Sequence, residues 1–96
     1  MVESQLERLG MIPTGRGAWH GVTVTESRPG VFQGWTVTAR VDEDEPNPRR
    51  RYGVLVRMAG DLGEYSARYV ACLADLPTLA AAALRDPYHV TGAAGR

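Results

Sequence analysis

Apolar and polar residues alternate with a period of two between residues 22 and 58, which predicts β-strands. Three runs share this pattern, with one apolar face and one face rich in threonine and arginine. The apolar faces hold Val22 and Val24 in the first run, Trp35, Val37, Ala39 and Val41 in the second, and Tyr52, Val54, Val56 and Met58 in the third. The links between the runs are short, which predicts a three-stranded antiparallel meander. Because only one face of these strands is apolar, we expect that face to be covered by helices.

Apolar residues at helical spacing flank these strands on both sides. Val2, Leu6 and Leu9 share one face of a short N-terminal helix. After the strands, helical spacing relates Tyr65, Tyr69, Leu73 and Leu76. Pro77 would interrupt a continuous helix, so we expect a break near residues 75–77. A new helix would then begin with Asp75 as its cap and Pro77 in its first turn, and run through residues 78–85.

The predicted fold class is α+β, with the element order α-β-β-β-α-α. In this fold the C-terminal helices pack on one face of the meander, and the 96 residues form a single small domain. We expect an ordered core over about residues 18–86 and flexible segments at 10–17, 43–49 and 91–96. The predicted core comprises Val22, Val24, Trp35, Val37, Val41, Val54, Val56, Met58, Tyr65, Tyr69, Leu73, Leu76, Leu79 and Leu84. A domain this small has a thin margin of stability, so a homodimer is one hypothesis.

The order of helix, three-stranded meander and helix resembles that of double-stranded-RNA-binding domains. That family carries a basic cluster at the start of its last helix, whereas the matching residues 62–67 contain no basic residue. The resemblance is one of topology and implies no function.

Charge and composition narrow the function classes. All 11 basic residues are arginine, as expected of a GC-rich genome such as that of an actinobacterium or its phage, and 11 acidic residues balance them. A neutral chain lacks the broad basic field of a dedicated nucleic-acid binder. The single Cys72 excludes an internal disulfide and fits a reducing compartment. The acidic N-terminus is unlike a signal peptide and the apolar stretches are short, so we expect a cytoplasmic protein with no membrane contact.

The sequence contains no recognisable motif of a catalytic or cofactor-binding site. Cys72 is expected to be a buried apolar residue of a helix, and His20 and His89 are not paired with cysteines as zinc requires. The segment 15–17 has two glycines, but a strand follows it where a phosphate-binding loop would open a helix. We therefore expect no metal and no cofactor, and an enzyme that uses His20 with Glu26 is the least favoured hypothesis.

Candidate binding residues lie on the predicted outer face of the sheet and in the link before its third strand. Arg40 and Arg57 are expected on the outer face, while Arg49, Arg50 and Arg51 lie in the link. Arginine forks bind phosphates well, so these residues form a candidate anion-binding surface. The alternative is that the acidic residues 42–45 face the link arginines and limit pairing at the edge of the sheet.

The leading hypothesis is a non-enzymatic protein-interaction or regulatory module, encoded by a phage or mobile element. It would bind a protein partner through the outer sheet face or an edge strand, because Trp19, Phe32 and Leu55 are expected on that face beside arginine. The alternative hypothesis is a nucleic-acid-binding domain that uses the arginine-rich sheet face and hairpin.

Overall fold

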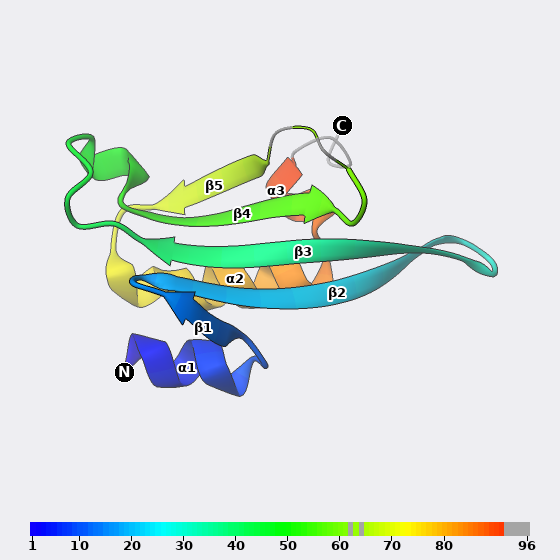
Figure 1. Cartoon of the computed structure of the whole chain (residues 1–96), viewed down its shortest axis with the longest axis horizontal. Coiled ribbons are helices and arrows are strands. Elements are labelled where there is room, and N and C mark those ends of the chain that lie inside the picture. The colour runs from blue at the N-terminus through cyan, green and yellow to red at the C-terminus, as the bar shows by residue number, and fades with distance from the viewer. Residues whose placement is uncertain (62, 64, 92–96) are drawn as a thin grey trace.

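The computed structural model describes residues 1–61, 63 and 65–91, which form a five-stranded antiparallel sheet with its helices on one side (Figure 1). The strands follow one another in chain order across the sheet. The helices are α1 (Val2–Arg8), α2 (Leu76–Arg85) and α3 (Tyr88–Thr91), with short 3-10 turns η1 (Pro48–Arg50) and η2 (Leu73–Asp75). The strands are β1 (Ile12–Gly15), β2 (Ala18–Arg28), β3 (Val31–Val41), β4 (Tyr52–Met58) and β5 (Ser66–Val70).

The predicted α+β class is confirmed, and the three predicted strands are present as β2, β3 and β4. The predicted number of strands is wrong, because β1 and β5 add an edge strand on each side. β1 forms within the segment predicted as a flexible connector, where Ile12 pairs with His20 and Pro13 with Trp19. The five-stranded sheet also removes the topological resemblance to double-stranded-RNA-binding domains.

Residues 66–70 were predicted to be helical and instead form β5, which pairs with β4 through Val54 and Arg68. The error has a geometric cause. A spacing of four residues, as between Tyr65 and Tyr69, places side chains on one face of a helix and equally on one face of a strand. Both tyrosines are exposed, and so are Met58 and Cys72, which were also expected to be buried.

The core lies between the sheet and α2, which packs on β3 and β4. Trp35, Val37, Val54, Val56, Leu76 and Leu79 are buried as predicted. Trp35 is fixed by two contacts: its Nε1 donates a hydrogen bond to Thr25 Oγ1 at 3.0 Å, and its ring meets Tyr88 edge-on at 4.9 Å. Leu6 of α1 is fully buried in the same core, as its helical spacing predicted.

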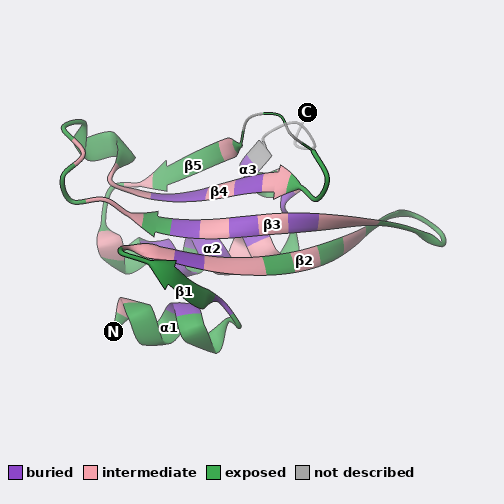
Figure 2. Ribbon diagram, viewed as in Figure 1, coloured by how far each residue is buried: buried purple, intermediate pink, exposed green. Residues whose placement is uncertain are grey.

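The two faces of β2 are exchanged relative to the prediction. Its pairing with β3 sets Trp19 opposite Ala39 and Thr23 opposite Trp35, so the odd-numbered residues of β2 face the helices. Thr23 Oγ1 donates a hydrogen bond to the carbonyl of Leu84 in α2 at 2.7 Å. Val22 and Val24 therefore point away from the helices and are 70% and 64% exposed. Figure 2 shows that buried, intermediate and exposed stretches follow one another along β2.

The C-terminal helical region agrees in part with the prediction from the sequence. α2 begins at Leu76 with Pro77 in its first turn, as expected, although the side chain of Asp75 makes no capping hydrogen bond. The predicted tail begins at Thr91, which belongs to α3, and residues 92–96 lie outside the described part of the chain. In the described residues, no helix is long and apolar enough to cross a membrane.

Candidate interaction surface

Among the described residues, no helix lies on the sheet face opposite α2, and we call this face the open face (Figure 1). Strand register assigns its residues, because side chains alternate between the faces and directly paired residues share a face. From β1 to β5 the open face comprises Ile12, Ala18, His20, Val22, Val24, Glu26, Phe32, Gly34, Thr36, Thr38, Arg40, Gly53, Leu55, Arg57, Ala67 and Tyr69.

Large apolar side chains on one side of this face are exposed to solvent. Ile12, Val22, Val24 and Phe32 are 65%, 70%, 64% and 64% exposed, and we call them the apolar strip. Scattered exposed apolar residues are ordinary, but several on adjoining strands are typical of an interaction site. In Figure 2 several stretches of β2 are coloured as exposed, and α2 lies behind the sheet.

The far end of the β2–β3 hairpin extends beyond the rest of the sheet as an arm, which comprises residues 25–33 (Figure 1). β3 pairs with β4 only over Trp35–Val41, so the arm has no third strand. Its tip is shaped by hydrogen bonds: the Glu26 carboxylate accepts one from the Gly30 amide at 2.9 Å. Gly30 has a φ of +77°, which glycine adopts without strain and which the turn after Pro29 requires. The arm thus presents Phe32 on a defined hairpin.

Arg40 and Arg57 lie on the open face, as the sequence predicted, and both have local partners. Arg40 forms an ion pair with Asp42 at 3.4 Å. The guanidinium of Arg57 lies 4.3 Å from the ring centroid of Tyr65, a cation–π contact, and Arg57 Nη1 donates to the carbonyl of Gly63 at 3.5 Å.

The link arginines lie beside the acidic residues of the same loop. Arg49 and Arg50 are exposed on η1, where the side chain of Asn47 accepts a hydrogen bond from the Arg49 amide at 3.0 Å. Arg51 Nε donates to the carbonyl of Glu45 at 2.8 Å. Next to them, the Tyr52 hydroxyl donates to Glu43 at 2.8 Å, and this hydrogen bond raises the pKa of the tyrosine above its ordinary value of 10.0.

The structure separates the three apolar residues that the sequence placed on the outer face. Phe32 is exposed on the open face and Leu55 is half-buried there. Trp19 instead lies on the helix-covered face and is only 9% exposed, so its predicted exposure is wrong. Its Nε1 has no hydrogen-bond partner among the described residues. The sequence analysis missed Ile12, Val22 and Val24, which occupy the open face in its place.

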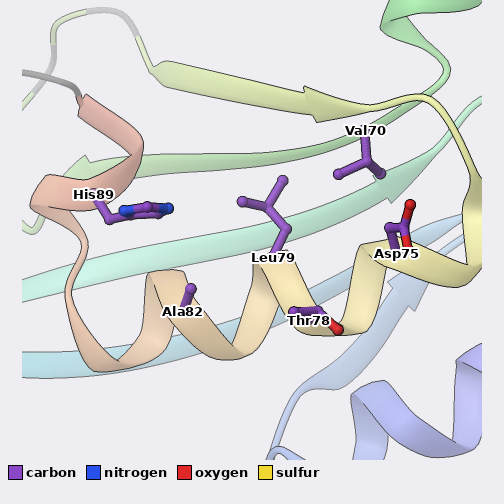
Figure 3. Close-up of a pocket in the computed structure, with 6 residues that line it drawn as sticks. All are labelled: Val70, Asp75, Thr78, Leu79, Ala82 and His89. Carbon is purple, nitrogen blue, oxygen red and sulfur yellow. The ribbon is translucent and has the colours of Figure 1, made fainter.

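A groove of about 360 Å³ lies on the other side of the sheet, between β5, α2 and α3 (Figure 3). Val70, Leu79 and Ala82 give it apolar walls. Asp75 and His89 lie at its opposite ends, with the side chain of Leu79 between them. The acid and the imidazole are therefore not assembled as a catalytic pair. The sequence offered no signal for this groove, because it predicted that Val70 lies in a helix and not in a strand.

The hypothetical pair of His20 and Glu26 is not brought together. The two residues lie six positions apart on the extended β2, which corresponds to about 20 Å. His20 Nδ1 lies 3.4 Å from Thr38 Oγ1, its neighbour across the strands. Within the described ranges, no group of three or more His, Cys, Asp or Glu side chains is arranged to hold a metal ion.

Comparison of the chain with protein-family models, with curated proteins and with solved structures found no match.

Proposed function

We propose that this chain is a non-enzymatic, cytoplasmic protein-interaction module that docks a protein partner on its open face. The observation that carries the proposal is the apolar strip, whose side chains are about two-thirds exposed on adjoining strands. Burying such side chains contributes about 25 cal/mol for each Å² removed from water, so the strip is a source of binding free energy. The helix-covered face is less exposed, because its large central side chains are buried in the core with residues of the helices, while Val31 and Met58 on that face are 41% and 40% exposed.

The two edge strands are less suited to a partner than the face. β1 is four residues long and contains Pro13, which has no amide hydrogen to offer a further strand. β5 carries the exposed Arg68 at its centre, and η1 lies against it. Short strands, proline and charged side chains are common means of preventing strand addition at an edge. These features favour docking on the open face over strand addition.

The experiment is a comparison of partner capture by the full chain and by two variants. Val22→Thr combined with Phe32→Thr keeps strand-forming residues but removes much of the apolar strip. Partners captured from the native host are identified by mass spectrometry, purified, and titrated against each chain. We expect at least a ten-fold weaker affinity for the double variant.

The matched control is Val31→Thr, because Val31 is exposed next to Phe32 but points to the other side of the arm. It should bind the purified partner as the unmodified chain does, and circular dichroism should show native structure in all three. Equal affinity of the double variant and the unmodified chain would refute the proposal.

Nucleic-acid binding through Arg40, Arg57 and the link arginines is the alternative function. It has weaker support, because Arg40 pairs with Asp42 and Arg57 stacks on Tyr65 in a chain with no net charge. Fluorescence anisotropy at about 50 mM salt tests it, since phosphate contacts are strong under that condition. Binding that falls steeply with salt and disappears in an Arg40→Gln, Arg57→Gln variant would favour this alternative.

A further inference from the structure

We propose that the occupant of the open face is a second copy of this chain, turned end for end about a two-fold axis that passes by Val22 and Thr36. The inference rests on the proposed function, because it names the partner of the same surface. The two copies would pack sheet against sheet, with each arm lying across the body of the other copy.

The register of β2 and β3 supplies the centre of this arrangement. Val22 is paired with Thr36 in the middle of the hairpin. Phe32 lies four residues from Thr36 along β3 in one direction and is paired with Glu26. Arg40 lies four residues from Thr36 in the other direction and is paired with Ala18. Each end is thus about 13 Å from the centre. A half-turn about the centre exchanges the two ends, as an isologous interface requires.

The two ends carry complementary chemistry. One presents the carboxylate of Glu26 and the exposed ring of Phe32, and the other presents the exposed guanidinium of Arg40, whose ion pair with Asp42 lies at the surface and would be exchanged for these groups. In the end-for-end arrangement, Arg40 of each copy lies against Phe32 and Glu26 of the other. A guanidinium is attracted both to an aromatic face and to a carboxylate. The two copies of Arg40 are kept apart, and the copies of Val22 meet at the centre. Arg57 is paired with Thr36 and therefore lies near the axis, where its contact with Tyr65 holds the guanidinium within its own chain.

Gly34 provides an independent observation. It lies inside β3 on the open face, and its φ is not in the left-handed region. A Cβ at this position would meet only the Cβ of Ala59, at 3.5 Å, which is ordinary contact. The single chain therefore does not need glycine here. Glycine inside a strand weakens it and often marks close approach by another molecule.

Gly53, on the same face, shows the contrast. A Cβ there would lie 2.5 Å from the ring of Tyr69, so the fold of the single chain accounts for that glycine. The end-for-end arrangement places Gly34 opposite Thr38 of the other copy and Ala18 opposite Glu26, so small side chains face larger ones. The need for space at Gly34 then has an explanation.

The surface that the two copies would share follows the β2–β3 hairpin, because the arm has no third strand. Stable protein interfaces bury about 800 Å² on each partner. The molecule is 41 Å long and the arm lies along this longest axis (Figure 1), so the shared surface is long but narrow and we expect a weak dimer. The arm, which has no third strand of its own, would gain a packing surface from the other copy.

Sedimentation velocity over a range of protein concentrations tests the proposal by charge exchange. Glu26→Arg and Arg40→Glu should each weaken self-association at least ten-fold. An equal mixture of these two variants should form a heterodimer, because both opposing contacts are then restored between unlike chains. Arg50→Glu, an exposed charge change in η1 away from the strip, is the control and should leave association unchanged.

Gly34→Thr provides the second measurement. It should leave the melting temperature of the dilute monomer unchanged or raise it, because threonine favours strands, and yet weaken association at least ten-fold. A variant that is as stable as the unmodified chain but does not associate cannot be explained by misfolding.

The outcomes separate this inference from the function on which it rests. An unmodified chain that stays monomeric up to high micromolar concentration overturns the dimer. So does association that persists in Gly34→Thr, or two charge variants that fail to form the heterodimer. If partner capture is still lost in the Val22→Thr, Phe32→Thr variant, the interaction function stands with another protein as the occupant. If the unmodified chain is monomeric and the Val22→Thr, Phe32→Thr variant still captures the partner, both proposals are refuted.

Discussion

The two faces of the sheet are built from similar residues and have opposite environments. Val37 in β3 is fully buried, while Val22, on the neighbouring strand, is 70% exposed. Both valines suit an extended, pleated backbone, so residue type alone does not distinguish them. What distinguishes them is α2, which covers one face of the central strands and leaves the other open. An apolar residue in an alternating run therefore indicates a strand, but it does not show whether that residue is buried in the core.

The covered face also has large anchors that the open face lacks. Trp19 and Trp35 both point toward the helices, and Trp35 contacts Tyr88 as well as Thr25. On the open face, the large side chain of Phe32 lies on the arm, where the fold supplies no helix to cover it. Stability should therefore depend on one face and recognition on the other.

The largest effect is expected where an aromatic side chain is removed from the covered face. Trp35→Ala should lower the free energy of unfolding by about 3–5 kcal/mol, the usual cost of truncating a buried aromatic residue. The matched change on the open face, Phe32→Ala, should alter it by less than about 0.5 kcal/mol in the monomer. Urea denaturation at low protein concentration measures both. Similar losses for the two variants would contradict the distinction between the faces.

A smaller and more specific difference is expected for two isosteric substitutions. Val37→Thr buries a hydroxyl on the covered face and should cost about 2 kcal/mol, because the new polar group has no obvious partner there. Val22→Thr exposes the same hydroxyl to water and should cost less than about 0.5 kcal/mol. Thermal and urea unfolding of both variants provide the comparison. If Val22→Thr is the more costly change in the monomer, our assignment of faces in β2 is wrong.

Two glycines on the open face should respond differently to alanine. Gly53→Ala should cost about 1 kcal/mol, because the new Cβ displaces the ring of Tyr69. The cost should shrink in a Tyr69→Ala background, which a double-mutant cycle would detect. Gly34→Ala should be neutral or stabilising in the monomer. Equal costs at the two glycines would remove the argument that Gly34 is not required by the single chain.

The smallest effect concerns pH and the hydrogen bond from Tyr52 to Glu43. This hydrogen bond raises the pKa of Tyr52 above 10.0, its ordinary value. A pKa raised by folding means that the stabilisation is complete below about pH 10 and is lost as the pH rises through the raised pKa. Absorbance titration should show that Tyr52 ionises at a higher pH than a free tyrosine, and Tyr52→Phe should remove that transition. An ordinary pKa for Tyr52 would show that the contact with Glu43 is not maintained in solution.

The sequence predicted the middle of the fold better than its margins. Long alternating runs identified β2, β3 and β4, and the apolar faces of β3 and β4 were assigned correctly through Trp35 and Val54. β1 was missed because Pro13 and Gly15 are typical of a loop. β5 was mistaken for a helix because its tyrosine spacing fits both structures. Short edge strands carry little local signal, since their pairing partners define them.

The candidate surface was predicted only in part for the same reason. Phe32, Arg40, Leu55 and Arg57 were placed on the open face because the faces of β3 and β4 were known from their own patterns. Val22 and Val24 were assigned to the core, and Trp19 to the surface, because β2 carries apolar residues on both faces. Its pattern shows alternation without showing which set of residues faces the helices.

The sequence by itself determined that β2, β3 and β4 are extended and that α1 and α2 are helical, because alternation, proline and helical spacing act on the backbone over a few residues. The tertiary structure decided which side of each strand is buried. Pairing Trp19 with Ala39 and Thr23 with Trp35 set the register of β2, and a shift of one residue would have exchanged its faces. Burial depends on which surfaces the helices cover, and that contact joins residues far apart in the chain.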